Sequence, residues 1–295
     1  MINEKRTVSG KLLEIDIYPV WKNGHRVPEK KPALSLPEQI RYNHRQCEKK
    51  LIRLVNANFD DKDIIMHPTY SPENAPLDEE RARNDLKNYL NRVRRKRKSE
   101  LKKIIKLLDE LPKSAAFDTL REKLTAQKKK LEQPFKYIYV IEEVVYQTGP
   151  YKGLVNYHFH MCVTGGLDRD VYEDMWKGGA RTNADRYQPK KYGPEALAKY
   201  IVKSHRRAGA KAYVCSRNIE DPDEKIKKTR LTPGGVERLA KQRADDNAYW
   251  EKRYKGYRVL KTYPRYNQYN GHWYLTVIMY ADSAENMPKW KFDEW

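Results

Sequence analysis

The stretch Tyr157-His158-Phe159-His160-Met161 has the alternating pattern of a β-strand. Because residues two apart on a strand point to the same side, His158 and His160 are predicted to project together from one face. Two neutral imidazoles with backbone-fixed spacing can supply two ligands to a divalent metal ion. The alternative is two unrelated polar residues on a solvated strand face.

Two strand patterns around this motif decide the fold class. Residues 135–146 and 154–163 read as strands, and the glycine-containing turn at 149–153 joins them as an antiparallel hairpin. Helical periodicity precedes and follows the hairpin, so the sequence predicts an α+β fold, an antiparallel sheet with flanking helices. A regular strand would place Glu142 beside the histidines and Glu143 on the other face, and a bulge would exchange them.

A second informative segment, residues 194–207, reads as a helix. Tyr200 and Lys203 are three apart and therefore share a helix face, while Leu197 and Ile201 mark the buried side. A tyrosine beside a lysine suits nucleophilic attack on a phosphodiester. The alternative is a tyrosine packed at the edge of the core, next to a solvated lysine.

His158-Phe159-His160 followed by Tyr200-Ile201-Val202-Lys203 resembles the motif pair of the HUH endonucleases. The order of the motifs is that of the rolling-circle replication initiators (Rep proteins) of phages and plasmids, including the filamentous-phage replication proteins. The resemblance covers roughly residues 50–218. It implies a ferredoxin-like, RRM-like endonuclease core with the histidine motif on a central strand.

The resemblance also implies a site-specific nicking and joining enzyme that starts rolling-circle replication. Tyr200 would attack the DNA, leaving a 5′-phosphotyrosine and a free 3′-hydroxyl. Mg²⁺ or Mn²⁺ would be held by His158, His160 and a third ligand, for which Glu142 is preferred. Lys203 would stabilise phosphate or leaving-group charge, or position the metal.

A single-tyrosine mechanism is expected, because no second tyrosine lies three or four positions from Tyr200. Tyr192, which precedes the helix, is the rival nucleophile. The third metal ligand stays open between Glu142 and Glu143. Two other functions also stay open: a single-tyrosine HUH transposase, and a nucleic-acid-binding protein without catalysis.

The composition points to a polyanionic partner. The chain has 60 Lys and Arg against 40 Asp and Glu, a net charge of +20, and 22 tyrosines. Residues 81–98 contain nine basic residues and one acid, a DNA contact in one interpretation and a solvated helix face in the other. The predicted DNA-binding residues are Arg92, Arg94, Arg95, Lys96, Arg97, Lys98, Lys199, Arg206 and Arg207.

Three scattered cysteines form no zinc or disulfide pattern, and no apolar run is long enough to span a membrane. A reducing cytoplasm is therefore expected. The resemblance implies a bacterial host cell, with single-stranded or supercoiled origin DNA, a host helicase and a polymerase as partners. The predicted organisation is an N-terminal extension, 1–50, the endonuclease domain, 51–218, with a helical-hairpin insertion near 99–132, and a C-terminal extension, 219–295.

Overall fold

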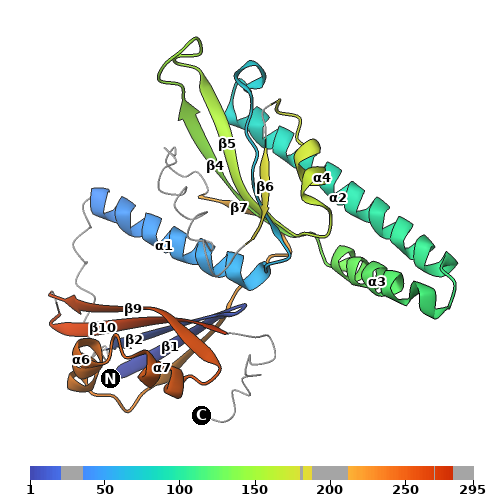
Figure 1. The fold of residues 1–295 in the computed structure, drawn as a ribbon. Coiled ribbons are helices and arrows are strands. Elements are labelled where there is room, and N and C mark those ends of the chain that lie inside the picture. Colours follow the sequence, from blue (N-terminus) through green and yellow to red (C-terminus); the bar gives the residue numbers. More distant parts are fainter. Residues whose placement is uncertain (21–35, 180–181, 188–211, 269, 282–295) are drawn as a thin grey trace. The chain divides into compact units, whose positions relative to one another are not determined.

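The computed structural model describes residues 1–20, 36–179, 182–187, 212–268 and 270–281 (Figure 1). Within these ranges the fold is α+β, as predicted, with two five-stranded antiparallel sheets and six α-helices. The strand orders are β8-β1-β2-β10-β9 and β6-β3-β5-β4-β7. The chain forms two compact units: unit 1 contains residues 1–39 and 220–295, and unit 2 contains residues 40–219.

Unit 1 joins the two ends of the chain in one sheet, a pairing that the sequence did not reveal. The N-terminal strands β1 (Ile2–Ser9) and β2 (Leu12–Pro19) pair with β8 (Asp223–Lys228) and β10 (His272–Ala281), respectively. The fifth strand, β9 (Tyr257–Asn267), lies at the edge beside β10. Most of the two predicted extensions, residues 1–39 and 220–295, thus forms one structural unit, whereas residues 40–50 belong to unit 2.

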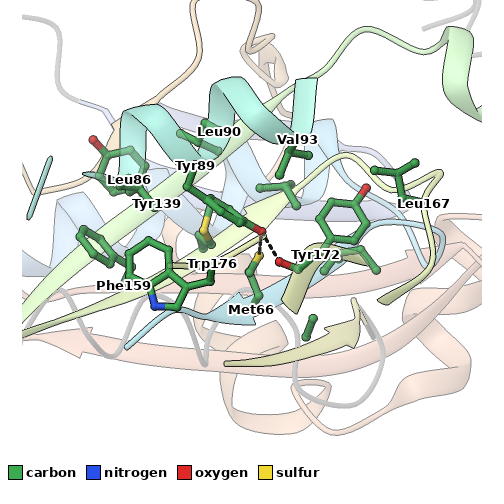
Figure 2. Packing of buried hydrophobic residues seen from close by; sticks show 14 of the residues in the cluster. Met66, Leu86, Tyr89, Leu90, Val93, Tyr139, Phe159, Leu167, Tyr172 and Trp176 are labelled. Atoms are coloured by element: carbon green, nitrogen blue, oxygen red, sulfur yellow. Dashed lines mark hydrogen bonds between the residues drawn. The ribbon is translucent and has the colours of Figure 1, made fainter. Parts of the chain in front are cut away.

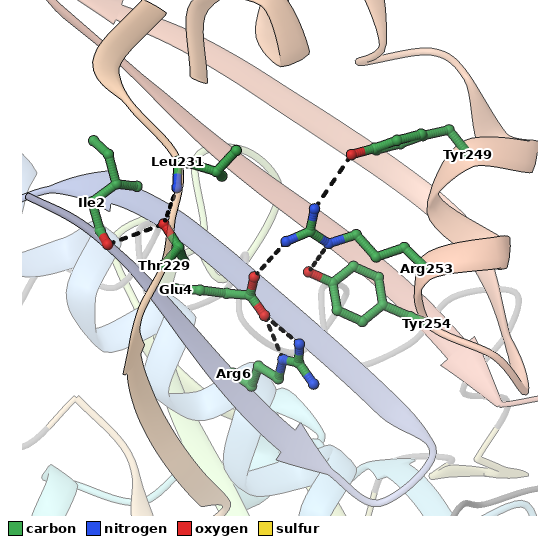
Figure 3. Close-up of polar contacts among 8 residues, drawn as sticks. All are labelled: Ile2, Glu4, Arg6, Thr229, Leu231, Tyr249, Arg253 and Tyr254. Atoms are coloured by element: carbon green, nitrogen blue, oxygen red, sulfur yellow. Dashed lines mark hydrogen bonds and ion pairs between the residues drawn. The ribbon is translucent and has the colours of Figure 1, made fainter. Parts of the chain in front are cut away.

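Two short helices follow β8 in unit 1. These are α6 (Pro233–Gln242) and α7 (Asn247–Arg253), and the Asp246 side chain caps the second by accepting from the Tyr249 amide at 3.0 Å. Buried Glu4 on β1 forms ion pairs with Arg253 of α7 at 3.0 Å and with Arg6, which fixes the first strand against this helix (Figure 3).

Unit 2 is the part of the chain that contains the histidine motif. Its helices are α1 (Leu36–Asn58), α2 (Glu79–Glu110), α3 (Asp118–Glu132) and α4 (Arg169–Asp174). Its strands are β3 (Ile64–His67), β4 (Tyr137–Val145), β5 (Val155–Val163), β6 (Asn183–Arg186) and β7 (Val214–Cys215).

The helical hairpin predicted near 99–132 is no separate insertion at its N-terminal side, because its first helix is the second part of α2, which runs without a break as one 32-residue helix. No proline or glycine interrupts it before Pro112, and Glu100 forms ion pairs with Lys96 and Lys103 at 3.0 Å each. The turn at Pro112 leads to α3, as expected for the hairpin. In the described part of the chain, no helix is long and apolar enough to cross a membrane.

The two faces of the unit 2 sheet are covered by different helices. On one face, Phe159 and Met66 pack against α2, where the Tyr89 hydroxyl lies 3.0 Å from the Tyr172 carbonyl oxygen and 3.1 Å from Met66 Sδ (Figure 2). On the other face, a second cluster joins the sheet to α1; its buried members include Leu51, Leu54, Val55, Ile138, Val140 and Cys162. Cys162 is fully buried in this second cluster, where it packs as a small core residue.

Candidate functional site

The histidine motif lies on β5, the central strand of the unit 2 sheet. Alternation along this strand places His158 and His160 on the same side as Cys162, which is the face covered by α1. Glu142 on β4 is in register with His158, so its side chain belongs to this same face. The strands therefore bring two imidazoles and one carboxylate together just beyond the apolar part of the face.

A third histidine completes the cluster. His67 ends β3, the other neighbour of β5, and its Nδ1 lies 2.8 Å from Nδ1 of His160. Nε2 of His160 lies 2.9 Å from the Glu142 carboxylate. A carboxylate can only accept, so Nε2 of a neutral His160 donates to Glu142 and its Nδ1 accepts from Nδ1–H of His67. The two hydrogen bonds therefore have a defined direction: His67 donates to His160, and His160 donates to Glu142.

Burial favours the neutral form of two imidazoles of this site, those of His67 and His158. His160 is 5% exposed, and burial lowers the pKa values of His67 and His158 below the ordinary 6.5. The charges of Asp185 at His67 and of Glu142 at His158 oppose this pKa shift without cancelling it. Because only the neutral ring has a free lone pair, these histidines are prepared to act as ligands at neutral pH.

A signal for His67 lies in the alternation of its own strand. Pro68, which lacks a donor for the ladder, follows the last residue of β3. Alternation from Ile65 nevertheless places His67 on the α1 face, where Ile65 packs against the cluster. What the sequence could not show is that β3 pairs with β5 and so brings His67 to His160.

The donor types of the cluster fit a divalent ion, but the side chains do not converge on one point. Imidazoles suit a transition ion better than Mg²⁺, which prefers oxygen ligands. Among the described residues, no group of three His, Cys, Asp or Glu side chains is arranged to hold a metal. Both ring nitrogens of His160 take part in the hydrogen-bonded chain, so an ion would have to replace at least one of these bonds.

The structure separates the two glutamates between which the sequence left a choice. Glu142 faces the histidines, whereas Glu143 is in register with Tyr157 and points to the other face, because the β4–β5 ladder contains no bulge. The other predicted catalytic residues, Tyr200 and Lys203, lie outside the described residues. So do the predicted DNA contacts Lys199, Arg206 and Arg207.

One residue of the basic stretch on α2 has a structural role instead of the predicted DNA contact. Arg97 is 3% exposed, and its guanidinium donates to the carbonyl oxygens of Thr164, Lys130, Leu131 and Gln133 at 3.0–3.4 Å. A guanidinium enclosed by carbonyls cannot reach a DNA phosphate, so the sequence-based role of Arg97 is corrected.

The other basic residues of this stretch differ in how accessible they are. Half-buried Arg92 donates to the Met175 carbonyl oxygen at 3.0 Å, and Lys96 pairs with Glu100. The exposed residues are Arg94, Arg95 and Lys98. These three are the members of the predicted stretch that are most accessible to a polyanion.

Comparison of the chain with protein-family models, with curated proteins and with solved structures gave no significant match. The assignment of a function therefore rests on the residues and the geometry of the site itself.

Proposed function

We propose that the protein is an HUH-type nicking and joining enzyme that initiates rolling-circle replication by cleaving single-stranded DNA at an origin. The observation that carries the proposal is the grouping of His158, His160 and Glu142 on one sheet face, with His160 and Glu142 2.9 Å apart. Buried His160 beside a carboxylate, and half-buried His158 with its lowered pKa, support the role of a metal site. The net charge of +20 supports a nucleic-acid substrate.

In the proposed reaction, the phenolic oxygen of Tyr200 attacks the scissile phosphorus. The new bond joins this oxygen to phosphorus, the bond from phosphorus to the 3′-oxygen breaks, and the departing 3′-oxygen takes up a proton. The phosphotyrosine bond conserves the energy for rejoining, and Lys203 neutralises charge on the phosphate or leaving group. A bound Mn²⁺ or Mg²⁺ would polarise the non-bridging phosphate oxygens.

The cluster contributes three functions of its own to this scheme. His158 and His160 would bind the ion through ring lone pairs, and Glu142 would supply a negative oxygen ligand or orient His160 through their hydrogen bond. His67 fixes the other side of the His160 ring, with the ring centroids 5.0 Å apart and the planes at 64°. These two bonds fix the orientation of the His160 ring, and coordination of an ion by His160 requires that one of them is replaced.

The test is covalent capture from a randomised library of single-stranded oligonucleotides, which requires no knowledge of the origin. Incubation with Mn²⁺ should give a protein–DNA adduct that survives denaturation, and sequencing of the captured strands should give one consensus. Mass spectrometry should place the adduct on Tyr200. Tyr200→Phe keeps the ring and removes the attacking oxygen, so it should give no adduct.

Two results would contradict the proposal. Complete absence of an adduct in Mn²⁺ and Mg²⁺ would leave a nucleic-acid-binding protein without catalysis as the better assignment. An adduct on Tyr192, or one that persists in Tyr200→Phe, would remove Tyr200 from its role. A captured consensus that matches the ends of a mobile element would favour the transposase alternative.

A further inference from the structure

A groove on the other side of the unit 2 sheet combines aromatic and basic side chains. It has a volume of about 650 Å³ and lies between α2, the end of α3, the start of β4 and residues 216–218. This volume is within the roughly 300–1,000 Å³ that is usual for ligand sites. The lining residues that matter here are Arg94, Lys98, Phe135, Tyr137, Arg217 and Asn218.

The groove is distinct from the histidine cluster. Tyr137 and Tyr139 alternate with Ile138 and therefore point to the α2 face, whereas Ile138 packs on the α1 face with the histidines. Tyr137 is also five residues from Glu142 along β4, which corresponds to about 17 Å at the usual rise of a strand. A ligand in the groove would therefore contact neither His158 nor His160.

A row of aromatic rings forms one side of the groove. The rings of Phe135 and Tyr137 are 6.2 Å apart, and those of Tyr137 and Tyr139 are stacked at 6.2 Å with their planes at 23°. Phe135 and Tyr137 are half-buried, so their rings are partly open to a ligand. Planar, partly exposed rings spaced along a strand are surfaces on which nucleobases stack without sequence preference.

The opposite side of the groove supplies positive charge. Arg94, Lys98 and Arg217 are exposed, and neither Lys98 nor Arg217 has an ion pair within the described part of the chain. The Arg94 guanidinium lies 5.7 Å from the centre of the Phe135 ring, so charge and ring are adjacent. The acid that lines the groove, Glu132, lies 3.8 Å from Lys128.

Buried Arg97 adds a fixed charge to the wall of the groove. Its centre lies 5.8 Å from the Phe135 ring, on a guanidinium that bonds to carbonyl oxygens rather than to a carboxylate. Asp63 interacts with the Arg97 charge electrostatically, and the two side chains form no ion pair in the described part of the chain. The net potential at the groove is therefore positive, which complements a polyanion.

Residues 216–218 are hydrogen-bonded to the start of β4 and to Phe135 just before it. The Ser216 amide donates to the Tyr137 carbonyl oxygen at 2.9 Å, and the Tyr137 amide donates to Ser216 Oγ at 3.1 Å. Asn218 Nδ2 donates to the Phe135 carbonyl oxygen at 3.3 Å. These bonds hold Arg217 at the groove, where it adds to the positive charge of Arg94 and Lys98.

We propose that this groove is a second DNA-binding site, which stacks a base of single-stranded DNA on Phe135 and Tyr137 and binds the flanking phosphates through Arg94, Lys98 and Arg217. The groove adds to the proposed function a contact with DNA outside the cleavage site. It rests on that function only for the choice of DNA as the polyanion.

Binding is tested with fluorescein-labelled oligodeoxythymidylate and the full-length protein in EDTA, where cleavage is not expected. The double variant Arg94→Gln/Lys98→Gln should raise the Kd about tenfold and reduce the salt slope by about 1.4, the value for two phosphate contacts on a single strand. The matched control is Lys102→Gln/Lys106→Gln, which removes the same charge from exposed positions of α2 outside the groove. Its Kd should change less than about twofold.

Stacking is tested with a 2-aminopurine-labelled single strand, whose fluorescence the wild-type protein should quench. Phe135→Leu should relieve part of the quenching while circular dichroism stays unchanged. Equal losses of DNA affinity in the two double variants would contradict the proposal that the groove binds DNA. Fluorescence quenching that is unchanged in Phe135→Leu would contradict it as well. If the groove variants show these effects but the protein forms no covalent adduct, the groove proposal stands and the proposed enzymatic activity is contradicted. The failures of the two proposals can therefore be distinguished.

Discussion

His67 and His160, which are 93 residues apart in the sequence, hydrogen-bond to each other through their Nδ1 atoms at 2.8 Å. The bond occupies a lone pair of His160 while Glu142 accepts from its other nitrogen. Metal binding at His160 is therefore coupled to a rearrangement of its neighbours. The following expectations depend on this arrangement and on the buried charges around it.

Mn²⁺ should stabilise the folded protein, because an ion that binds only the native state shifts the unfolding equilibrium. At about 100 times its Kd the ion adds about 2.7 kcal/mol. Mg²⁺ should have a smaller effect at equal concentration, since imidazole is a poor ligand for it. Differential scanning fluorimetry measures both ions, and His158→Ala is the control that should abolish the response. Equal stabilisation of parent and variant would place the ion elsewhere.

Substitution of either His158 or His160 by alanine should remove metal-dependent cleavage and leave DNA binding nearly unchanged. The basic residues elsewhere supply most of the affinity, whereas each lost imidazole removes a metal ligand. The measurement is adduct formation in Mn²⁺ together with anisotropy titrations of the same proteins. Normal adduct formation by both variants would exclude these histidines from the reaction.

Acidification should destabilise the fold through His67 and His158. Their folded pKa values lie below 6.5, so the unfolded chain binds protons first and stability falls as the pH drops below about 7. Asp63 acts in the opposite sense, since burial raises its pKa to about 6. The double variant His67→Gln/His158→Gln should therefore lose less stability than the parent between about pH 7 and about pH 5. Urea unfolding at each pH measures the difference, and parallel curves would refute it.

Arg97→Ala should cost about 3 kcal/mol or more in unfolding free energy, because four buried carbonyl contacts lose a charged donor together. Arg95→Ala, at an exposed position of the same helix, should change stability by less than about 0.5 kcal/mol. Chemical denaturation of both variants makes the comparison. A stable Arg97→Ala protein with weakened DNA binding would restore the role that the sequence suggested.

The sequence predicted the features that depend on local pattern. Alternation at 157–161 identified the strand and the common face of the two histidines, and a regular β4 put Glu142 with them. Pairing between distant segments has no local signal, so neither His67 beside His160 nor the sheet shared by the chain ends could be predicted.

The burial of Arg97 likewise could not be predicted from local pattern. Composition suggested a basic helix for binding DNA, and the surrounding arginines and lysine at 94, 95 and 98 are indeed exposed. One position of the same run turns inward, where α3 and the loop before β4 present their carbonyl oxygens. The sequence alone does not reveal whether a basic side chain contacts solvent, DNA or the carbonyl oxygens of the protein's own backbone.

The sheet of unit 1 imposes an order on folding during synthesis. The hairpin of β1 and β2 is translated before unit 2, whereas its neighbours β8 and β10 are translated only after unit 2. Unit 2 can acquire its core while unit 1 is still incomplete. Until the last strand emerges, the hairpin has two unpaired edges and an uncovered apolar face, with Leu13, Ile15 and Ile17 exposed to other chains. Chains that terminate early should therefore aggregate through their first twenty residues even though unit 2 is already folded.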